Sequence, residues 1–540
     1  MWSHNYTPLA GSLGLSALVA ALPIFALLYL LGVRRMPAWK AALSGLAAAV
    51  LVALFLYRMP VGTAVSAIGY GAAFGLFPIG WVVFTAILLY RVTVETGKFD
   101  IIRDSIGSLS RDRRLQALLI AFAFGAFIEG AAGFGTPVAV AAAMLTGLGF
   151  SPFYSASICL LANTAPVAFG SIGTPILTLA TVTNLPLDRL SAAVGRICAP
   201  ISLFVPAYLI AVMGGWKAAK RVLPAIVLCG VTFATTQILV SNFVGPQLTD
   251  ILSSLVTMGA LVLLLCFWKP KDEFTLEGED HTAQGASPRR GAGEIMLAWG
   301  PYAILVVMVL LWGFFKAPLN KVTLAFPWPG LHERVLQVAP VVVTPTPYRA
   351  IFRFEWLAAP GTACLLASLL SALLLGMSPL RFGKLLAKTA KQLFLSELTI
   401  ASVLALAFLM NYSGATATLG LAFAATGILF PFFSSLLGWL GVFLTGSDTS
   451  ANALFGNLQV VTAGRLGLNP VLMAAANSSG GVMGKMISLQ SIAVAAAATG
   501  MASSDEAKLF RFTLRHSIVL ASAIGLVVTF YAYVAPHWAP

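Results

Sequence analysis

Residues 125–137 read Gly125-Ala-Phe-Ile-Glu-Gly-Ala-Ala-Gly-Phe-Gly-Thr-Pro137, a carboxylate set among glycines in an otherwise apolar run. A second stretch follows the same plan: Gly441-Val-Phe-Leu-Thr-Gly-Ser-Asp-Thr-Ser-Ala-Asn-Ala453. At one constant offset, Gly125, Phe127 and Gly130 fall on Gly441, Phe443 and Gly446. Duplicated apolar segments that glycine interrupts are the sequence sign of a binding site in a secondary transporter.

The composition excludes a soluble protein. The chain has 540 residues, of which 59% are hydrophobic and 10% charged, and its mean hydropathy is +0.90. A soluble fold cannot bury so much apolar surface, so we expect a polytopic membrane protein in contact with the lipid bilayer. The net charge of +14 does not indicate nucleic acid, because the basic residues stand in short clusters between apolar runs, as the positive-inside rule describes.

Apolar runs of about 20 residues, the length that spans a bilayer as a helix, recur along the chain. Two runs, 115–150 and 432–463, are long but broken by glycine, and we interpret them as re-entrant hairpins, one from each side of the membrane. This topology places every basic cluster in the cytoplasm and both termini in the periplasm. Segment 415–430 is then the counterpart of helix 99–109 on the membrane surface, although a further span there remains an alternative.

The expected fold is therefore an all-α polytopic membrane protein built as an inverted repeat. It has two re-entrant hairpins and two interrupted helices. The N-terminal half is 1–271, a polar cytoplasmic linker covers 272–295, and the C-terminal half is 296–540. Irregular backbone inside a membrane is tolerated where it lines a protein or water cavity, so the hairpin tips should meet at the site.

Two acids lie at the predicted hairpin tips. An ionised carboxylate in apolar surroundings is costly, so Glu129 is either paired, hydrated or protonated, and the last state suits a proton carrier. The alternative is a structural carboxylate that caps glycine-loop amides. Asp448 is either a proton or cation site or the N-cap of the outgoing helical arm. The tip residues themselves are Gly130, Gly133, Gly135, Gly446, Ser447, Thr449, Ser450 and Asn452.

Lys485 is the sharpest single signal, because it stands in a long apolar run next to the second predicted break. It is a natural counter-charge for a substrate carboxylate, or alternatively the permanent ion-pair partner of Glu129 or Asp448. Hydroxyls and amides near the two breaks can contact substrate, although some will satisfy freed backbone groups. This polar lining consists of Asn163, Thr164, Ser171, Thr174, Asn477, Ser478, Ser479 and Ser488.

Other classes of protein find little support in the sequence. There is no phosphate-binding loop of the Gly-x-x-x-x-Gly-Lys-[Ser/Thr] type, which argues against an ATP-driven pump. The five cysteines show no metal-ligand spacing, so we expect neither a metal nor a cofactor. The lack of a nucleophile and base pattern argues against an enzyme.

Taken together, these motifs resemble the bacterial lactate permease family. The residues that carry the resemblance are Phe99-Asp-Ile-Ile-Arg, Gly125-Ala-Phe-Ile-Glu-Gly-Ala-Ala-Gly-Phe-Gly, Asn163-Thr-Ala-Pro-Val-Ala-Phe-Gly, Gly438-Trp-Leu-Gly-Val-Phe-Leu-Thr-Gly-Ser-Asp-Thr-Ser and Gly484-Lys-Met-Ile-Ser. The resemblance implies proton-coupled uptake of L-lactate, often with D-lactate and glycolate, across the bacterial inner membrane. The sequence is also similar to a wider superfamily of elevator-type carriers with paired re-entrant hairpins. The family usually has a proline after Lys485-Met-Ile-Ser, whereas this chain has Leu489, so the second break should be less sharp than the first.

The leading hypothesis is a proton symporter of small 2-hydroxymonocarboxylates, in which Lys485 and half-helix amides hold the carboxylate. A sodium-coupled or dicarboxylate carrier is the alternative within the same class, and a passive anion channel is an alternative outside it. Homo-oligomer formation, the stoichiometry and the preference among L-lactate, D-lactate and glycolate stay open at this stage.

Overall fold

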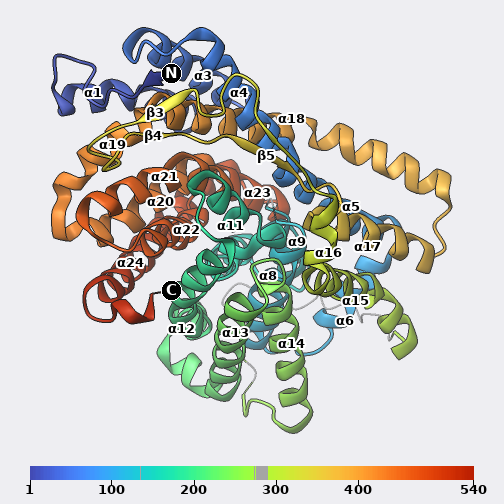
Figure 1. Ribbon diagram of the computed structural model, residues 1–540. Coiled ribbons are helices and arrows are strands. Elements are labelled where there is room, and N and C mark those ends of the chain that lie inside the picture. The colour runs from blue at the N-terminus through green and yellow to red at the C-terminus, as the bar shows by residue number, and fades with distance from the viewer. Residues whose placement is uncertain (134, 273, 275–289, 540) are drawn as a thin grey trace.

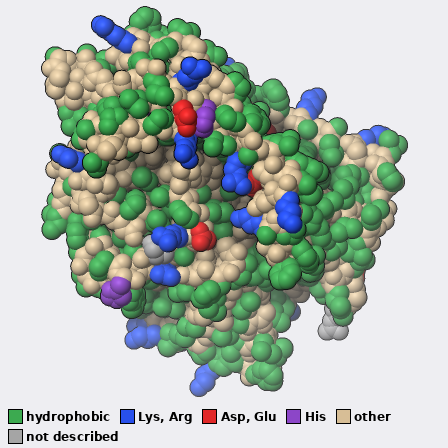
Figure 2. Space-filling model, in the orientation of Figure 1, with side chains coloured by type: hydrophobic (Ala, Val, Ile, Leu, Met, Phe, Trp, Pro, Cys, Tyr) green, Lys and Arg blue, Asp and Glu red, His purple; other side chains and the backbone are tan. Residues whose placement is uncertain are grey.

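The computed structural model describes residues 1–133, 135–272, 274 and 290–539. Within these ranges, eleven helices are long and apolar enough to cross a membrane, or up to thirteen if each of two bent helix pairs is counted as one span. Hydrophobic side chains cover much of the surface, and charged side chains gather in a few places (Figure 2). The chain is therefore a multi-pass, mainly helical membrane protein.

One side of the molecule combines the first helices with a long later helix (Figure 1). The later helix, α18, packs against α3, α4 and α5 and shares a hydrophobic core with α1 to α5. The bounds of these elements are α1 (Leu13–Ala20), α2 (Leu22–Gly32), α3 (Ala38–Leu51), η1 (Val52–Leu56), α4 (Val61–Phe74), η2 (Gly75–Gly80), α5 (Trp81–Glu95) and α18 (Pro379–Ser413).

Short strands cover this same side (Figure 1). One lies at the chain start, β1 (Trp2–Ser3), and four lie between α16 (Lys316–Leu319) and α17 (Pro360–Leu374), namely β2 (Leu324–Pro327), β3 (Val335–Gln337), β4 (Thr346–Pro347) and β5 (Ile351–Phe354). They form two small sheets, β1-β3-β4 and β2-β5, with β1 parallel to β3. The chain start is thus fixed to a loop more than 300 residues away, and the fold is not purely α-helical.

The first half continues through a helical hairpin and an interrupted helix. Hairpin 1, residues 113–147, has two arms that pack against each other on either side of a glycine turn. The interrupted helix that follows bends by 66°. The elements are α6 (Lys98–Gly107), α7 (Arg113–Gln116), η3 (Ala117–Phe124), α8 (Gly125–Ala131), α9 (Thr136–Gly147), α10 (Pro152–Ala162), η4 (Val167–Phe169) and α11 (Gly170–Thr183).

A group of long helices encloses these elements from the opposite side (Figure 1). Helix α13 packs between α12 and α14, and α15 packs on α17. Their bounds are α12 (Leu187–Arg221), α13 (Leu223–Phe243), α14 (Thr249–Phe267), α15 (Ala292–Phe314), α16 (Lys316–Leu319), η6 (Asn320–Val322) and α17 (Pro360–Leu374). Residues 273 and 275–289 of the predicted linker 272–295 lie outside the described residues, and its last residues belong to α15, which begins at Ala292.

The second half contains elements in the same order, a helical hairpin followed by a broken helix. Hairpin 2, residues 430–466, turns at Gly446, and a short break at 486–488 follows in the next helix. The elements are α19 (Ala415–Phe423), η7 (Ala424–Leu429), α20 (Phe430–Thr445), α21 (Asp448–Leu466), α22 (Pro470–Lys485), α23 (Leu489–Thr499), α24 (Ser503–Tyr533) and η8 (Pro536–Trp538).

Small residues let α20 and α22 pack with their backbones almost in contact. A Cβ atom at Gly480 would lie 2.0 Å from the carbonyl oxygen of Ser435, and one at Gly484 would lie 2.3 Å from that of Trp439. Gly438 faces the backbone of Asn477 in the same way. Glycine pairs of this kind bring helices together where the hydrophobic effect does not drive helix association, as in a bilayer.

Both predicted hairpin segments form a helix, a glycine turn and a second helix, and the first break is the sharper one, whereas re-entry into the membrane stays a prediction. Helices α22 and α23 together count as one span, without a bend above 40°, so the second break is the milder one. In segment 415–430, α19 begins after the left-handed Gly414, as α6 begins after the left-handed Gly97, and η7 then leads directly into α20, so that Ala415–Thr445 also passes as one candidate span. Its position relative to the membrane stays a prediction.

Candidate functional site

Glu129 lies in the last turn of α8, at the tip of hairpin 1. The turn is made by Gly133 and Gly135, both with positive φ. Glu129 is 4% exposed, and its Oε2 atom has no hydrogen-bond partner. A Cβ atom at Gly170 would lie 2.5 Å from Glu129 Oε1. The carboxyl therefore fits against the interrupted helix because position 170 is glycine.

The break of the first interrupted helix has unusual backbone geometry. Ser171 (φ 47°) and Ile172 (φ 58°) both adopt left-handed conformations, followed by Gly173. This conformation is unfavourable for a β-branched residue such as isoleucine, and strain of this kind is concentrated at functional sites. The Ser171 hydroxyl is buried without a hydrogen-bond partner, and the buried amide of Asn163 faces the Glu129 carboxyl. Polar groups with spare hydrogen-bonding capacity thus lie beside Glu129.

Lys485 ends α22 and reaches the tip of hairpin 2. Its Nζ donates a hydrogen bond of 2.5 Å to the carbonyl oxygen of Gly446, the left-handed residue at that tip. Lys485 is 7% exposed and interacts electrostatically with both Glu129 and Asp448. It forms an ion pair with neither acid, so the alternative of a permanent ion pair is wrong. The site keeps a buried cation without a paired anion.

Asp448 begins α21, directly after the hairpin 2 turn. Its Oδ2 accepts hydrogen bonds from Ser478 Oγ at 2.5 Å and from Asn452 Nδ2 at 3.3 Å, whereas Oδ1 has no partner. Ser447 is the N-cap of α21, since its side chain accepts from the Ser450 amide. The interpretation of Asp448 as the helix cap is therefore wrong.

The two hairpins and the two breaks come together around α23. A Cβ atom at Gly135 would lie 3.7 Å from Val494, and one at Gly446 would lie 2.7 Å from Gln490. On the other side, Asn452 donates a hydrogen bond of 3.1 Å to the carbonyl oxygen of Pro175 in α11. Each hairpin therefore contacts the interrupted helix of the other half of the chain.

The predicted polar lining divides into engaged and free side chains. Thr164 and Thr174 donate to backbone carbonyls, and Ser488 caps α23. Asn477 lies inside the continuous helix α22, so its expected place at a glycine break is wrong. Its side-chain amide donates hydrogen bonds to the carbonyl oxygen of Ala451 and to Asn452 Oδ1, and it accepts one from Gln459. The free side chains that carry unpartnered buried polar atoms are Asn163, Ser171 and Ser479.

Two residues of this region were missed from the sequence. Asp250, in the first turn of α14, has 0% exposure and no partner for either carboxyl oxygen. The sequence does contain a sign of this residue, since Asp250 is an acid directly before the apolar run 251–268. An acid at that position is, however, also common at the start of an ordinary helix. Gln490 had no such signal, since its contact with Gly446 depends on how the hairpin folds back.

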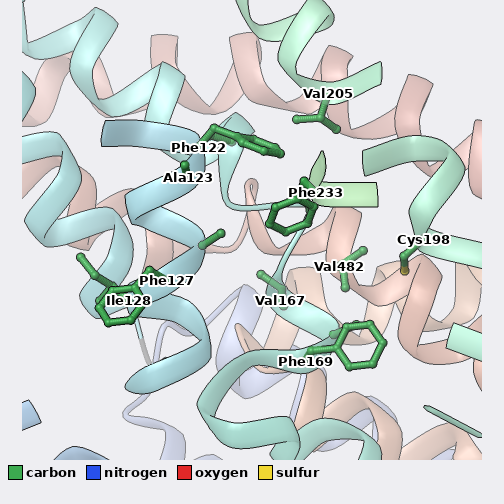
Figure 3. Packing of buried hydrophobic residues seen from close by; sticks show 14 of the residues in the cluster. Phe122, Ala123, Phe127, Ile128, Val167, Phe169, Cys198, Val205, Phe233 and Val482 are labelled. Carbon is green, nitrogen blue, oxygen red and sulfur yellow. The ribbon is translucent and has the colours of Figure 1, made fainter. Parts of the chain in front are cut away.

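Aromatic packing holds hairpin 1 and the first break in place. Phe122 and Phe233 contact each other with ring centroids 5.0 Å apart, and Val167 and Phe169 of the break lie nearby (Figure 3). All four belong to one large buried hydrophobic cluster that also includes Val482 of α22. Because interiors of this kind are close-packed, the polar side chains of the site have a rigid apolar support.

Comparison with known proteins gives consistent results over the full length. The family model described as L-lactate permease matches residues 16–535. The L-lactate permease of Bacillus subtilis (strain 168) is 46% identical, covering 99% of both chains. The glycolate permease GlcA of Escherichia coli (strain K12) is 47% identical, covering 99% of this chain and 98% of its own. The L-lactate permease of Escherichia coli (strain K12) is 45% identical over the whole of both chains.

Proposed function

The chain belongs to the L-lactate permease family, and on this premise we propose that it carries L-lactate and glycolate into the cell together with a proton. Both substrates are small 2-hydroxymonocarboxylates, and relatives of similar identity are named for each of them. D-lactate has the same functional groups and is included in the proposal. The location proposed is the bacterial inner membrane, with both termini in the periplasm.

The observation that carries the proposal is the unpaired Lys485 between two acids. Its ammonium interacts with Glu129 and Asp448 but is hydrogen-bonded to a neutral carbonyl. A buried cation with spare donors favours binding of an external carboxylate, because each new charge-assisted hydrogen bond lowers the electrostatic cost of burial.

Charge balance then links the substrate to a proton. With Lys485 protonated and one nearby acid ionised, the empty site is neutral. A bound lactate anion would leave it with one excess negative charge, which is costly in a buried site. Protonation of the acid restores neutrality, so one proton accompanies one substrate anion. Glu129 and Asp448 are the proposed carriers, since each keeps a buried oxygen without a partner.

The substrate hydroxyl requires neutral partners. Asn163, Ser171 and Ser479 supply free amide and hydroxyl groups near the acids and the lysine. We assign the 2-hydroxyl to this set, whereas the carboxylate binds Lys485 and the amides at the nearby helix N-termini. A second buried cation that would clamp a dicarboxylate is not found among the described residues near the site.

An inverted-repeat elevator mechanism is part of the proposal. Two separate hydrophobic cores support it: one is centred on α1 to α5 and α18, and the other contains both interrupted helices. The unit with the hairpins would slide along the first core and carry the site across the membrane. Residues Ala453, Leu454, Phe455 and Leu458 of α21 pack into the first core and mark this interface.

The test is uptake of labelled L-lactate into proteoliposomes, with and without an inward proton gradient and with sodium varied. We expect accumulation that a protonophore abolishes and that sodium does not affect, and unlabelled glycolate should compete. If accumulation instead depends on sodium, the coupling ion is sodium and not the proton. Equilibration that ignores every gradient would instead indicate a passive anion channel.

A further inference from the structure

Asp250 packs against Gly130, next to Glu129 in hairpin 1, and the transport mechanism proposed above does not use it. Its Cβ would lie 2.8 Å from a Cβ atom at Gly130, the residue that follows Glu129. The two carboxyl groups interact electrostatically, although they belong to α14 and α8. Asp250 therefore extends the row of ionisable groups from Lys485 through Glu129 to a third residue.

Among the described residues, none near Asp250 supplies a group that neutralises an ionised carboxylate. Neither of its oxygens accepts a hydrogen bond, and its exposure is 0%. The neighbouring elements α13 and η3 carry no charged residue, α8 contributes Glu129, and α12 contributes the uncharged thiol Cys198. Burial of an unpaired carboxylate is strongly unfavourable, so the structure favours an acid that carries a proton for part of the cycle.

A purely structural interpretation is that Asp250 is an ion held by the N-terminus of α14. Acids in a first helical turn are stabilised by the helix dipole, typically by about 0.3–1 kcal/mol at exposed positions. That range is small beside the cost of burying an unpaired carboxylate. Such an ion would also be expected to accept hydrogen bonds from the free backbone amides of the turn, and Asp250 accepts none.

Exposed residues lie a few positions before Asp250 in the chain. Phe243, which ends α13, is 83% exposed, and Val244, which begins the α13–α14 connection, is 50% exposed. Pro246 of the same connection packs on Gly173 in the first break. Asp250 thus follows this connection along the chain and interacts with Glu129, which in turn interacts with Lys485.

We propose that Asp250 is a proton-relay residue that supplies Glu129 from the surface at the α13–α14 connection. The O–H bond of the Asp250 carboxylic acid breaks, and the proton forms a new O–H bond on the Glu129 carboxylate. Water that reaches the connection then returns a proton to Asp250. This inference rests on the proposed proton coupling, and it assigns to Asp250 the refilling of Glu129 without contact to the substrate.

The test compares two transport modes of the Asp250→Asn variant in proteoliposomes. Net uptake driven by a proton gradient needs repeated refilling of Glu129, whereas lactate counterflow at equal pH uses a carrier that keeps its proton. We expect gradient-driven accumulation to fall by about tenfold or more, in line with the loss of one proton-transfer group. Counterflow should stay close to that of the wild type.

The matched control is Asp188→Asn, which removes an exposed acid from the first turn of α12. Like Asp250→Asn, it removes one carboxyl group from the first turn of a helix. Both gradient-driven uptake and counterflow should stay unchanged in this control. Normal accumulation in Asp250→Asn would overturn the relay, and so would an equal loss of both modes. A wild type that ignores the proton gradient would overturn the proposed coupling itself.

Labelling of the wild type keeps the relay testable if Asp250→Asn fails to fold. Dicyclohexylcarbodiimide reacts with protonated carboxyl groups in apolar surroundings, and peptide mass spectrometry locates the product. We expect Asp250 to be labelled at neutral pH, and labelling should decrease as the pH rises. An Asp250 that stays unlabelled while Glu129 reacts would overturn the relay.

Discussion

Lys485 Nζ is hydrogen-bonded at 2.5 Å to the carbonyl oxygen of Gly446, at the tip of hairpin 2. An ammonium group has three donors, so this bond leaves two for other partners. The same bond connects the end of α22 to the turn of the hairpin, and Gly446 adopts a left-handed conformation there. A substrate anion at Lys485 would thus be bound beside the hairpin tip.

Replacement of Lys485 by alanine should strongly weaken L-lactate binding while the protein still folds. Charge-assisted hydrogen bonds contribute about 1.5–3 kcal/mol, so we expect at least about a tenfold loss of affinity. Binding to detergent-solubilised protein by calorimetry measures this directly. Lys485→Arg is the matched variant that keeps the charge, and it should retain part of the affinity. Wild-type affinity in Lys485→Ala would refute the assigned role.

Glu129→Gln should separate lactate movement from the proton gradient. Glutamine has the shape of the protonated acid but cannot release a proton, so counterflow should persist while gradient-driven accumulation is lost. The measurement is lactate uptake with a simultaneous pH readout inside the vesicles. Asp188→Asn is the control for removal of one acidic charge. If Glu129→Gln still accumulates lactate with the gradient, the carrier is another acid, and Asp448 becomes the next residue to test.

Much of the architecture could be predicted from the sequence because it depends on local patterns. Glycine at the tips, the charge pattern and the repeated motif located both hairpins to within a few residues. The missing proline at Leu489 correctly indicated the milder second break. Such features report backbone conformation, which neighbouring residues largely determine.

The parts that were missed depend on packing between distant segments. Asn477 looked like a ligand, but α22 continues through Gly480 and Gly481, and its amide is bonded to α21. Asp250 looked like a helix start, and its burial follows from contact with Gly130 more than 100 residues earlier. A single sequence does not determine which of two polar residues faces a site. Periodicity indicates which face of a helix is buried, but it does not identify the helix that packs against that face.

Gly170→Ala is a steric test of the Glu129 position. The new Cβ would lie 2.5 Å from Glu129 Oε1 and 3.1 Å from its Cγ, so the carboxyl must move. We expect gradient-driven uptake to fall by about tenfold or more, because small displacements at a reacting group have large effects on rate. Gly147→Ala in α9 is the matched control, since its Cβ would meet no atom within 4 Å. Equal activity of both variants would contradict the role of Glu129.

The N-terminal strand should loosen in mild acid because of His4. This side chain is 5% exposed, with Nε2 2.9 Å from the carbonyl oxygen of Tyr412 and Nδ1 3.2 Å from the hydroxyl of Tyr6. Burial lowers the pKa of His4 from 6.5 to about 4. The unfolded chain therefore binds more protons than the folded one between these two values.

Stability from the neutral His4 should thus be complete above about pH 6.5 and decline as the pH falls towards 4. A pKa difference of this size corresponds to about 3 kcal/mol, since one pKa unit equals about 1.4 kcal/mol. The measurement is the melting temperature of wild type and His4→Gln between pH 4 and 8, with the exposed His537→Gln as control. As the pH falls from 6.5 to 4, the melting temperature of the wild type should approach that of His4→Gln. The difference in melting temperature between the wild type and His537→Gln should stay constant. An advantage that persists unchanged at pH 4 would show that His4 is not held neutral between the N-terminal strand and Tyr412.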